Sequence, residues 1–454
     1  MYHSFGAGHS RYSATRGGGL GRGNWRGHHS SEPTATGTTP PPRGTLIERV
    51  THEGLLSNPA LRIVKPAIQK CQYVASFSWL RGEKPTIVIP GMPPKWAPLA
   101  VPQQLEEDSG SYFRDINAVH YPQHPIEPAV RSVLAQAPDL ATDEVDVFAC
   151  GSTMGNLLRF ARKSAKPFQL IVETIGDTVF LIRRENSPDE KIMDVHGYGH
   201  TFPETYTKLD DCVKKADSHQ RLIRYEFAGF QCIVRYEGDG YLPDHLGSGL
   251  RSGDVQRLPQ LDGLKMVEGG KMVPQEAMFD VKTRSARRQL TLEDVLSGEI
   301  DRLWVRQIPN FVLAHHTSGV FHDVKVHDVR QKIRAWEETH QQEIKVLSAA
   351  LAKILAMARS RPSERFEICS GTPGVLEIRH VGGDFPNALP DDLVRMWAKG
   401  ADGQDGHEGE SDDDADSGAD SDAEGGFDLH SDEDDEQDFT ACSEGCGYCG
   451  RCNY

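Results

Sequence analysis

Apolar and polar residues alternate in short segments through the middle of the chain, from about residue 45 to about residue 400. A period of two predicts half-buried strands, and two such segments around a glycine-containing turn predict a hairpin. We therefore expect hairpins at 168–183 and 221–236, which turn at Gly176-Asp177 and Ala228-Gly229. Further strands are expected at 73–80, 86–90, 145–149, 278–284, 310–316, 320–326, 366–368 and 375–381.

Other segments carry apolar residues three or four positions apart, which predicts helices. These lie at 127–134, 156–165, 209–213, 291–308, 329–359 and 391–399, and Thr291 with Asp294 forms a capping-box start for the fourth. The glycines of Cys150-Gly-Ser-Thr-Met-Gly155 predict a turn from strand to helix, since the Lys-Ser/Thr ending of a phosphate-binding loop is missing. Hairpins mixed with helices predict an α+β fold of mixed sheets flanked by helices.

Composition divides the chain into four parts. Residues 1–44 are rich in Gly, Ser, Thr and Pro with interspersed Arg, which predicts a disordered arm that either binds RNA or only solubilises the protein. Residues 45–400 form the expected folded domain. Residues 401–440 hold 18 acidic and no basic residues, so the remainder of a chain of formal charge −16 carries +2. That tail is expected to be a disordered, solvated arm, a partner-binding arm or a mimic of RNA. Because the acidity is confined to the tail, the net charge does not argue against nucleic-acid binding by the folded domain.

Neither a membrane span nor a secretory signal is recognisable in the apolar pattern. Five scattered cysteines are typical of buried thiols in a reducing compartment. We therefore expect a soluble intracellular protein of the nucleus or cytoplasm with no membrane partner. The last part, 441–454, carries four further cysteines, and either a zinc site or free, redox-active thiols would account for them: Cys442, Cys446, Cys449 and Cys452.

Two predicted strands carry charged residues among apolar ones. Glu237 and Asp239 are two residues apart on the first, and Asp280 and Lys282 are two apart on the second, so each pair is expected on one face of its strand. Residues 243–276 are interpreted as an insertion between these strands. If the strands are neighbours, three carboxylates and one ammonium meet at one point, as in the PD-(D/E)xK nuclease core, and would suit Mg²⁺ or Mn²⁺. The alternative is an exposed strand face with a cross-strand ion pair.

The order of these segments resembles the decapping exoribonuclease family, which removes faulty or non-canonical caps from RNA 5′ ends. The matching segments are Gly199-His-Thr-Phe-Pro-Glu204, Glu237-Gly-Asp239, Asp280-Val-Lys282 and Trp304-Val-Arg-Gln307, within about residues 140 to 325. The chain departs from the family where Gly151-Ser152 replaces an RNA-contacting Arg, Pro203 shifts Glu204 by one position, and Asp280 replaces a Glu. It is similar to a divergent, fungal-type member.

The resemblance implies roles for the matching residues. Metal ligands would be Glu204, Glu237, Asp239 and Asp280, while Lys282 and Gln307 would hold the scissile phosphate or the attacking water, with Glu237 also catalytic. The basic residues after the second strand, Arg284, Arg287 and Arg288, are candidate RNA contacts. The expected function is metal-dependent hydrolysis of a cap, triphosphate or phosphodiester at RNA 5′ ends, and a 5′-to-3′ exoribonuclease is an implied partner.

Two alternatives to this function remain at the level of sequence. A non-catalytic relative of the same fold that binds RNA or an exoribonuclease would explain the missing Arg. Asp412-Asp-Asp-Ala-Asp416 matches the aspartate-rich motif of prenyl diphosphate synthases, but those enzymes need two copies on facing buried helices, whereas this copy lies in the low-complexity tail.

Overall fold

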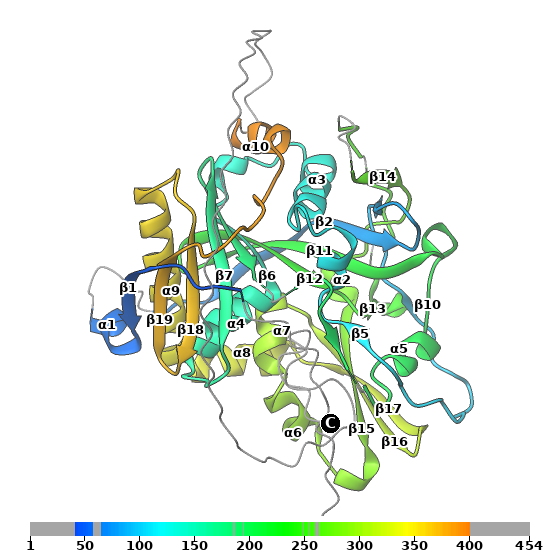
Figure 1. Ribbon diagram of the computed structural model, residues 1–454. Coiled ribbons are helices and arrows are strands. Elements are labelled where there is room, and N and C mark those ends of the chain that lie inside the picture. Colours follow the sequence, from blue (N-terminus) through cyan, green and yellow to red (C-terminus); the bar gives the residue numbers. More distant parts are fainter. Residues whose placement is uncertain are drawn as a thin grey trace, which may run out of the picture. The chain divides into compact units, whose positions relative to one another are not determined.

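The computed structural model describes residues 41–57, 65–184, 187–193, 195–247, 249–253, 255–258 and 263–399 (Figure 1). The predicted arm up to residue 40, the acidic tail and the four cysteines from Cys442 to Cys452 lie outside these ranges. Over the described ranges, no helix combines the length and the apolar character that a membrane crossing requires.

The core of the domain is a mixed sheet of eleven strands. In spatial order these are β1 (Leu46–Thr51), β19 (Val375–His380), β18 (Phe366–Thr372), β7 (Phe168–Ile175), β8 (Thr178–Arg183), β6 (Val147–Cys150), β12 (Phe230–Glu237), β11 (Ala216–Phe227), β2 (Ile68–Leu80), β3 (Thr86–Ile89) and β14 (Lys265–Glu268). Strand β6 runs parallel to both β8 and β12, whereas both predicted hairpins are antiparallel.

Helices cover both faces of this sheet (Figure 1). Strand β8 shows why: Val179 and Leu181 face one apolar cluster, while Phe180 and Ile182 face another. Its side chains alternate between the faces, so a strand buried on both sides is apolar throughout. The first cluster is completed by α4 (Gly151–Ala161), α7 (Ile300–Arg306), α8 (Arg330–Thr339) and α9 (Gln341–Ser360), and the second by α3 (Glu127–Gln136) and α10 (Asp391–Ala398).

A second sheet of six strands contains the charged segments. Its order is β10 (Thr207–Lys208), β4 (Lys95–Trp96), β13 (Gly240–Tyr241), β15 (Met278–Ser285), β16 (Asn310–Thr317) and β17 (Val320–Asp328). A two-stranded sheet pairs β5 (Tyr112–Phe113) with β9 (Lys191–Ile192), and the remaining helices are α1 (His52–Ser57), α2 (Ile116–His120), α5 (Thr201–Tyr206) and α6 (Leu292–Ser297). The mixed α+β architecture predicted from the sequence is confirmed.

The expectation that the two acidic strands are neighbours is wrong. Strand β12 belongs to the large sheet and β15 to the second, and the chain passes from one sheet to the other through Glu237, Asp239 and β13. The predicted insertion 243–276 also contributes a strand, because β14 pairs in parallel with β3 at the edge of the large sheet.

Helix boundaries differ from the predictions at four places. The expected helix 291–308 is divided at Gly298 into α6, which keeps the capping box, and α7. The expected helix 329–359 is divided at His340. No turn separates β6 from α4, since Gly151 is already helical, and helical spacing at 209–213 gives only a short 3₁₀ turn, Asp211–Val213. Apolar periodicity continues across a break in direction when both helices pack on the same core, so it cannot locate the break.

Candidate functional site

Two predicted site residues lie where the chain passes between the two sheets. Glu237 is the last residue of β12, and Asp239 follows it just before β13. Directly after Asp239 the backbone comes very close to β15, since a Cβ at Gly240 would overlap the ring of Phe279. The Asp239 carboxylate accepts a hydrogen bond from the backbone N–H of Val281 at 2.8 Å. Asp239 is therefore held by the strand that carries Asp280 and Lys282.

Glu204 reaches the same region from a different element. It lies in the first turn of α5, whose N-terminus is capped by the buried Asp108, which accepts hydrogen bonds from the backbone N–H groups of His200 and Thr201 at 2.9 and 2.8 Å. Such a cap satisfies N–H groups that the helix leaves without partners. The His200 ring stacks on Tyr112 with ring centroids 3.6 Å apart, and burial lowers the His200 pKa against the opposing charges of Asp108 and Glu204.

These side chains line one pocket of about 600 Å³, which we call the acidic pocket. Its wall contains four of the predicted site residues, Glu204, Glu237, Asp239 and Lys282, together with His200, His219 and Arg302. The predicted gathering of charged residues from three chain segments is thus present, except for Asp280, which is not part of the wall.

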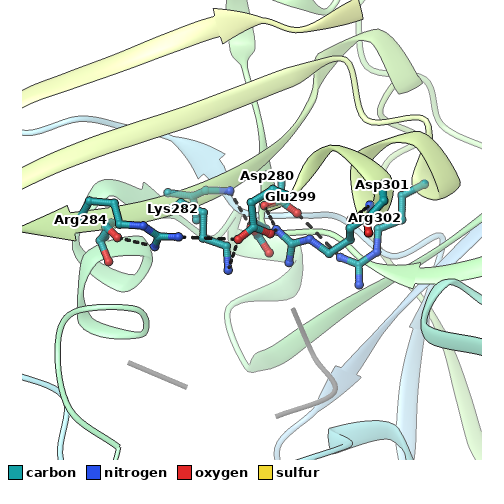
Figure 2. Close-up of polar contacts among 10 residues, drawn as sticks. Asp280, Lys282, Arg284, Glu299, Asp301 and Arg302 are labelled. Carbon is teal, nitrogen blue, oxygen red and sulfur yellow. Dashed lines mark hydrogen bonds and ion pairs between the residues drawn. The ribbon is translucent and has the colours of Figure 1, made fainter. Parts of the chain in front are cut away.

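Asp280 and Lys282 point from β15 toward α7 and are almost fully buried. Asp280 Oδ1 is paired with Arg302 Nη2 (Figure 2), and its Oδ2 lies 3.8 Å from Arg306 Nη1. The two arginines are four residues apart and so share one helix face. The two carboxylate oxygens of Asp280 therefore both face guanidinium groups.

Glu299 is the second acid of this buried cluster. It is the N-cap residue of α7, is 0% exposed, and lies 3.2 Å from Lys282 Nζ, 3.8 Å from Arg284 Nη2 and 3.1 Å from Arg302 Nη2 (Figure 2). We call Asp280, Lys282, Arg284, Glu299, Arg302 and Arg306 the ion-pair cluster. Buried charges of this kind are stable only when they are paired and hydrogen-bonded.

The pKa of Asp239, on the wall of the acidic pocket, is raised far above its ordinary value. Burial, and then the nearby charge of Asp280, raise it to about 7, although Arg302, the Val281 N–H and Arg306 act in the opposite direction. A carboxyl group with a pKa near neutrality can exchange a proton with a substrate or water under physiological conditions. Burial, together with the charge of Arg221, also lowers the pKa of His219 on the pocket wall well below its usual value.

The four expected metal ligands are not gathered as one group in the structure. Among the described residues, no group of three or more His, Cys, Asp and Glu side chains is placed to hold a metal ion. The physical reason is that Asp280, one of the four expected ligands, is engaged by Arg302 and Arg306. Arg302 thus provides positive charge at Asp280 and Glu299, close to where the sequence predicts a divalent cation.

The remaining predicted residues lie outside the acidic pocket. Gln307 ends α7 in a left-handed conformation, and its side chain turns back to donate a 2.5 Å hydrogen bond to the Trp304 carbonyl. Arg284 is buried in the ion-pair cluster, whereas Arg287 and Arg288 are exposed. Sequence reasoning missed Glu299, Arg302 and Arg306, although their spacing on one helix face next to the Asp-x-Lys segment was an available signal.

Comparisons with known proteins place the chain as follows. A family model described as a domain of unknown function (DUF8563) matches residues 59–369, and no curated protein matches the sequence. The solved structure of Rai1 of S. pombe is similar, with 10% sequence identity and a TM-score of 0.47, over 74% of this chain and 99% of that one. Rai1 of Scheffersomyces stipitis in complex with (3′-NADP)⁺ and calcium ion has 12% identity and a TM-score of 0.49, over 79% of this chain and 99% of that one. Dxo1 of K. lactis in complex with manganese has 9% identity and a TM-score of 0.45, over 72% of this chain and 95% of that one. These are structures of the family that the motifs indicated.

Proposed function

The chain belongs to the family described as a domain of unknown function (DUF8563), and we propose that it acts on the 5′ end of RNA by hydrolysing a phosphate ester or anhydride bond in the acidic pocket. One observation carries this proposal. Residues from three separate segments that the motif order singled out, Glu204, Glu237 with Asp239, and Lys282, line a single pocket. The choice of RNA 5′ ends rests on the motif order in the sequence.

The side chains of the pocket have the properties that hydrolysis of a phosphate bond needs. Asp239, with its pKa raised to about 7 by burial, can accept a proton from the attacking water. Lys282 and Arg302 present positive charge at the pocket wall, where it would stabilise negative charge that develops on phosphoryl oxygens. These roles require no resident metal ion; the Mg²⁺ or Mn²⁺ dependence expected from the sequence stays a prediction.

The test is hydrolysis of 5′-triphosphate, capped and 5′-monophosphate RNA by the full chain, with Mg²⁺, with Mn²⁺ and with a chelator. Asp239→Asn should abolish cleavage while keeping the fold, since the amide keeps the acceptor for the Val281 N–H but cannot take a proton. Asp244→Asn is the matched control, because Asp244 is an exposed acid five residues along the chain and outside the pocket wall. Equal cleavage by wild type and Asp239→Asn would refute the assignment.

A non-catalytic function is the second candidate, and the Asp280 ion pairs favour it. A relative that has exchanged a metal-binding carboxylate for an Asp–Arg pair would keep the fold and bind RNA, or an exoribonuclease, without cleaving. For this candidate, none of the three RNAs is cleaved under any metal condition, yet 5′-end RNA still binds and Asp239→Asn leaves binding unchanged.

A further inference from the structure

A second cavity lies beside the acidic pocket, at the N-terminus of α4. It has a volume of about 50 Å³, and its wall includes four arginines, Arg114, Arg183, Arg235 and Arg306, two acids, Asp115 and Glu237, and the residues Cys150, Gly151 and Ser152. We call it the arginine pocket. Glu237 lies on the wall of both cavities, so the two adjoin.

Arg235 is the residue that makes this cavity unusual. It lies in β12 beside Cys150 of the parallel strand β6, and only 9% of it is exposed. Its Nη1 donates to Gln220 Oε1 at 3.2 Å, its Nε has no hydrogen-bond acceptor, and none of the ion pairs found within the described ranges involves it. A buried guanidinium that no carboxylate neutralises is costly, and a bound anion would reduce that cost.

The first turn of α4 faces the same cavity. Its N-cap residue is Cys150, and no side chain there accepts a hydrogen bond from the first-turn N–H groups. A Cβ at Gly151 would lie 3.2 Å from Arg306 Nε, so glycine allows the helix end to approach this guanidinium closely. Free N–H groups and the helix dipole favour an anion at this end of an eleven-residue helix.

The Cys150 thiol reports the same electrostatic environment. Its Sγ lies 3.0 Å from Ser152 Oγ and 2.9 Å from Thr153 Oγ1. Burial alone would raise its pKa, yet the pKa is lowered, because the charges of Arg235 and Arg183 and the two hydroxyl groups favour the thiolate. The cavity thus stabilises negative charge on a group that burial would otherwise keep neutral.

We propose that the arginine pocket is a binding site for one phosphate group, held by Arg235 and the N-terminus of α4. The size of the cavity agrees with this ligand, because about 50 Å³ accommodates only a few water-sized groups, the extent of one tetrahedral oxyanion. The ligand is either free phosphate or the terminal phosphate of RNA whose end occupies the acidic pocket. Only the second source rests on the proposed function.

The test measures binding of inorganic phosphate to the full chain by calorimetry, at ionic strength matched with chloride, and alkylation of Cys150 by iodoacetamide, followed by mass spectrometry. Phosphate should bind saturably and should slow the alkylation of Cys150 severalfold, since a bound anion disfavours the negative charge of the reactive thiolate. Alkylation of the exposed Cys212 should not change, which makes it an internal control.

Two variants tie the effect to Arg235. Arg235→Gln should lose phosphate binding, whereas Arg224→Gln, which changes an arginine of the adjacent strand β11 outside the pocket, should keep it. If Arg235→Gln does not fold, Gln220→Glu serves instead, because it places a carboxylate at the hydrogen-bonding position of Arg235 Nη1 with little change in volume. Absence of saturable binding to folded wild type, or equal binding by wild type and Gln220→Glu, would overturn the proposal.

The source of the phosphate is identified with two short RNAs that differ only in a 5′-phosphate or 5′-hydroxyl group. Protection of Cys150 by the phosphorylated RNA at much lower concentration than by inorganic phosphate assigns the site to RNA ends, and equal concentrations assign it to free phosphate. Phosphate binding without any RNA cleavage would leave this site established and would count against the hydrolytic function alone.

Discussion

The acidic pocket and the ion-pair cluster contain the same kinds of residue in two different states. Glu204, Glu237 and Asp239 face a pocket, whereas Asp280 and Glu299 are buried against Lys282 and arginines. In the sequence, Glu-x-Asp and Asp-x-Lys look like equal contributions to one metal site. The difference teaches that the partner of a carboxylate decides its role, and that partner comes from α7, which neither motif contains.

The largest effect is expected on stability, from the acid at the centre of the ion-pair cluster. Glu299→Gln removes the carboxylate that Lys282, Arg284 and Arg302 share. Breaking a buried ion pair by removing one partner costs about 3–5 kcal/mol. Urea denaturation should show this loss, while Glu293→Gln, whose exposed carboxylate pairs with Lys332, should unfold like wild type.

The second prediction concerns the affinity for a divalent cation after loss of Arg302. Arg302→Gln removes a guanidinium from Asp280 and from the wall of the acidic pocket. Because a positive charge a few ångströms away opposes cation binding, Mn²⁺ affinity should rise about tenfold or more. Electron paramagnetic resonance titration of free Mn²⁺ measures it, with Arg224→Gln as the control. An unchanged affinity would mean that Arg302 does not take the place of a cation.

The third prediction concerns how Asp239 of the acidic pocket makes stability and hydrolysis depend on pH. The folded-state pKa of Asp239 is raised to about 7, so the folded protein binds its proton more tightly than the unfolded chain does. Stability from this group is therefore greatest at low pH and is lost as pH rises through about 7. Asp239→Asn should flatten this fall in urea denaturation between pH 4 and pH 7, and in wild type any RNA hydrolysis should increase over the approach to pH 7. A fall of equal size in the variant would contradict the shift.

The smallest effect is expected at the basic residues that follow β15. Exposed Arg287 and Arg288 should act through phosphate contacts, so changing either to Gln should reduce the slope of log K for RNA binding against log salt by about one. Arg284→Gln, in the buried cluster, should lower stability instead. Fluorescence anisotropy at several salt concentrations distinguishes them, and equal slopes for all variants would exclude an RNA contact at these positions.

Much of this site could be predicted because strand alternation is a local property. Phe279 and Val281 pack against one apolar cluster, while Asp280 and Lys282 point to the other side of β15, as their spacing of two indicated. Both hairpins could be predicted for the same reason. In the second of them, for example, Ala228 and Gly229 have positive φ values that suit a tight turn. The helix breaks at Gly298 and His340 were missed, because the apolar periodicity continues across them.

The sequence by itself determined most strands and helices, the mixed α+β class and four residues of the acidic pocket, because each depends on the period of apolar positions or on residue type. Only the tertiary structure decided that β12 and β15 belong to different sheets, and that Arg302 and Arg306 reach Asp280. It also decided that Arg235 lies buried at the N-terminus of α4. The physical reason is that charge pairing acts through space between segments far apart in the chain, and no periodicity in the sequence records which charges will meet.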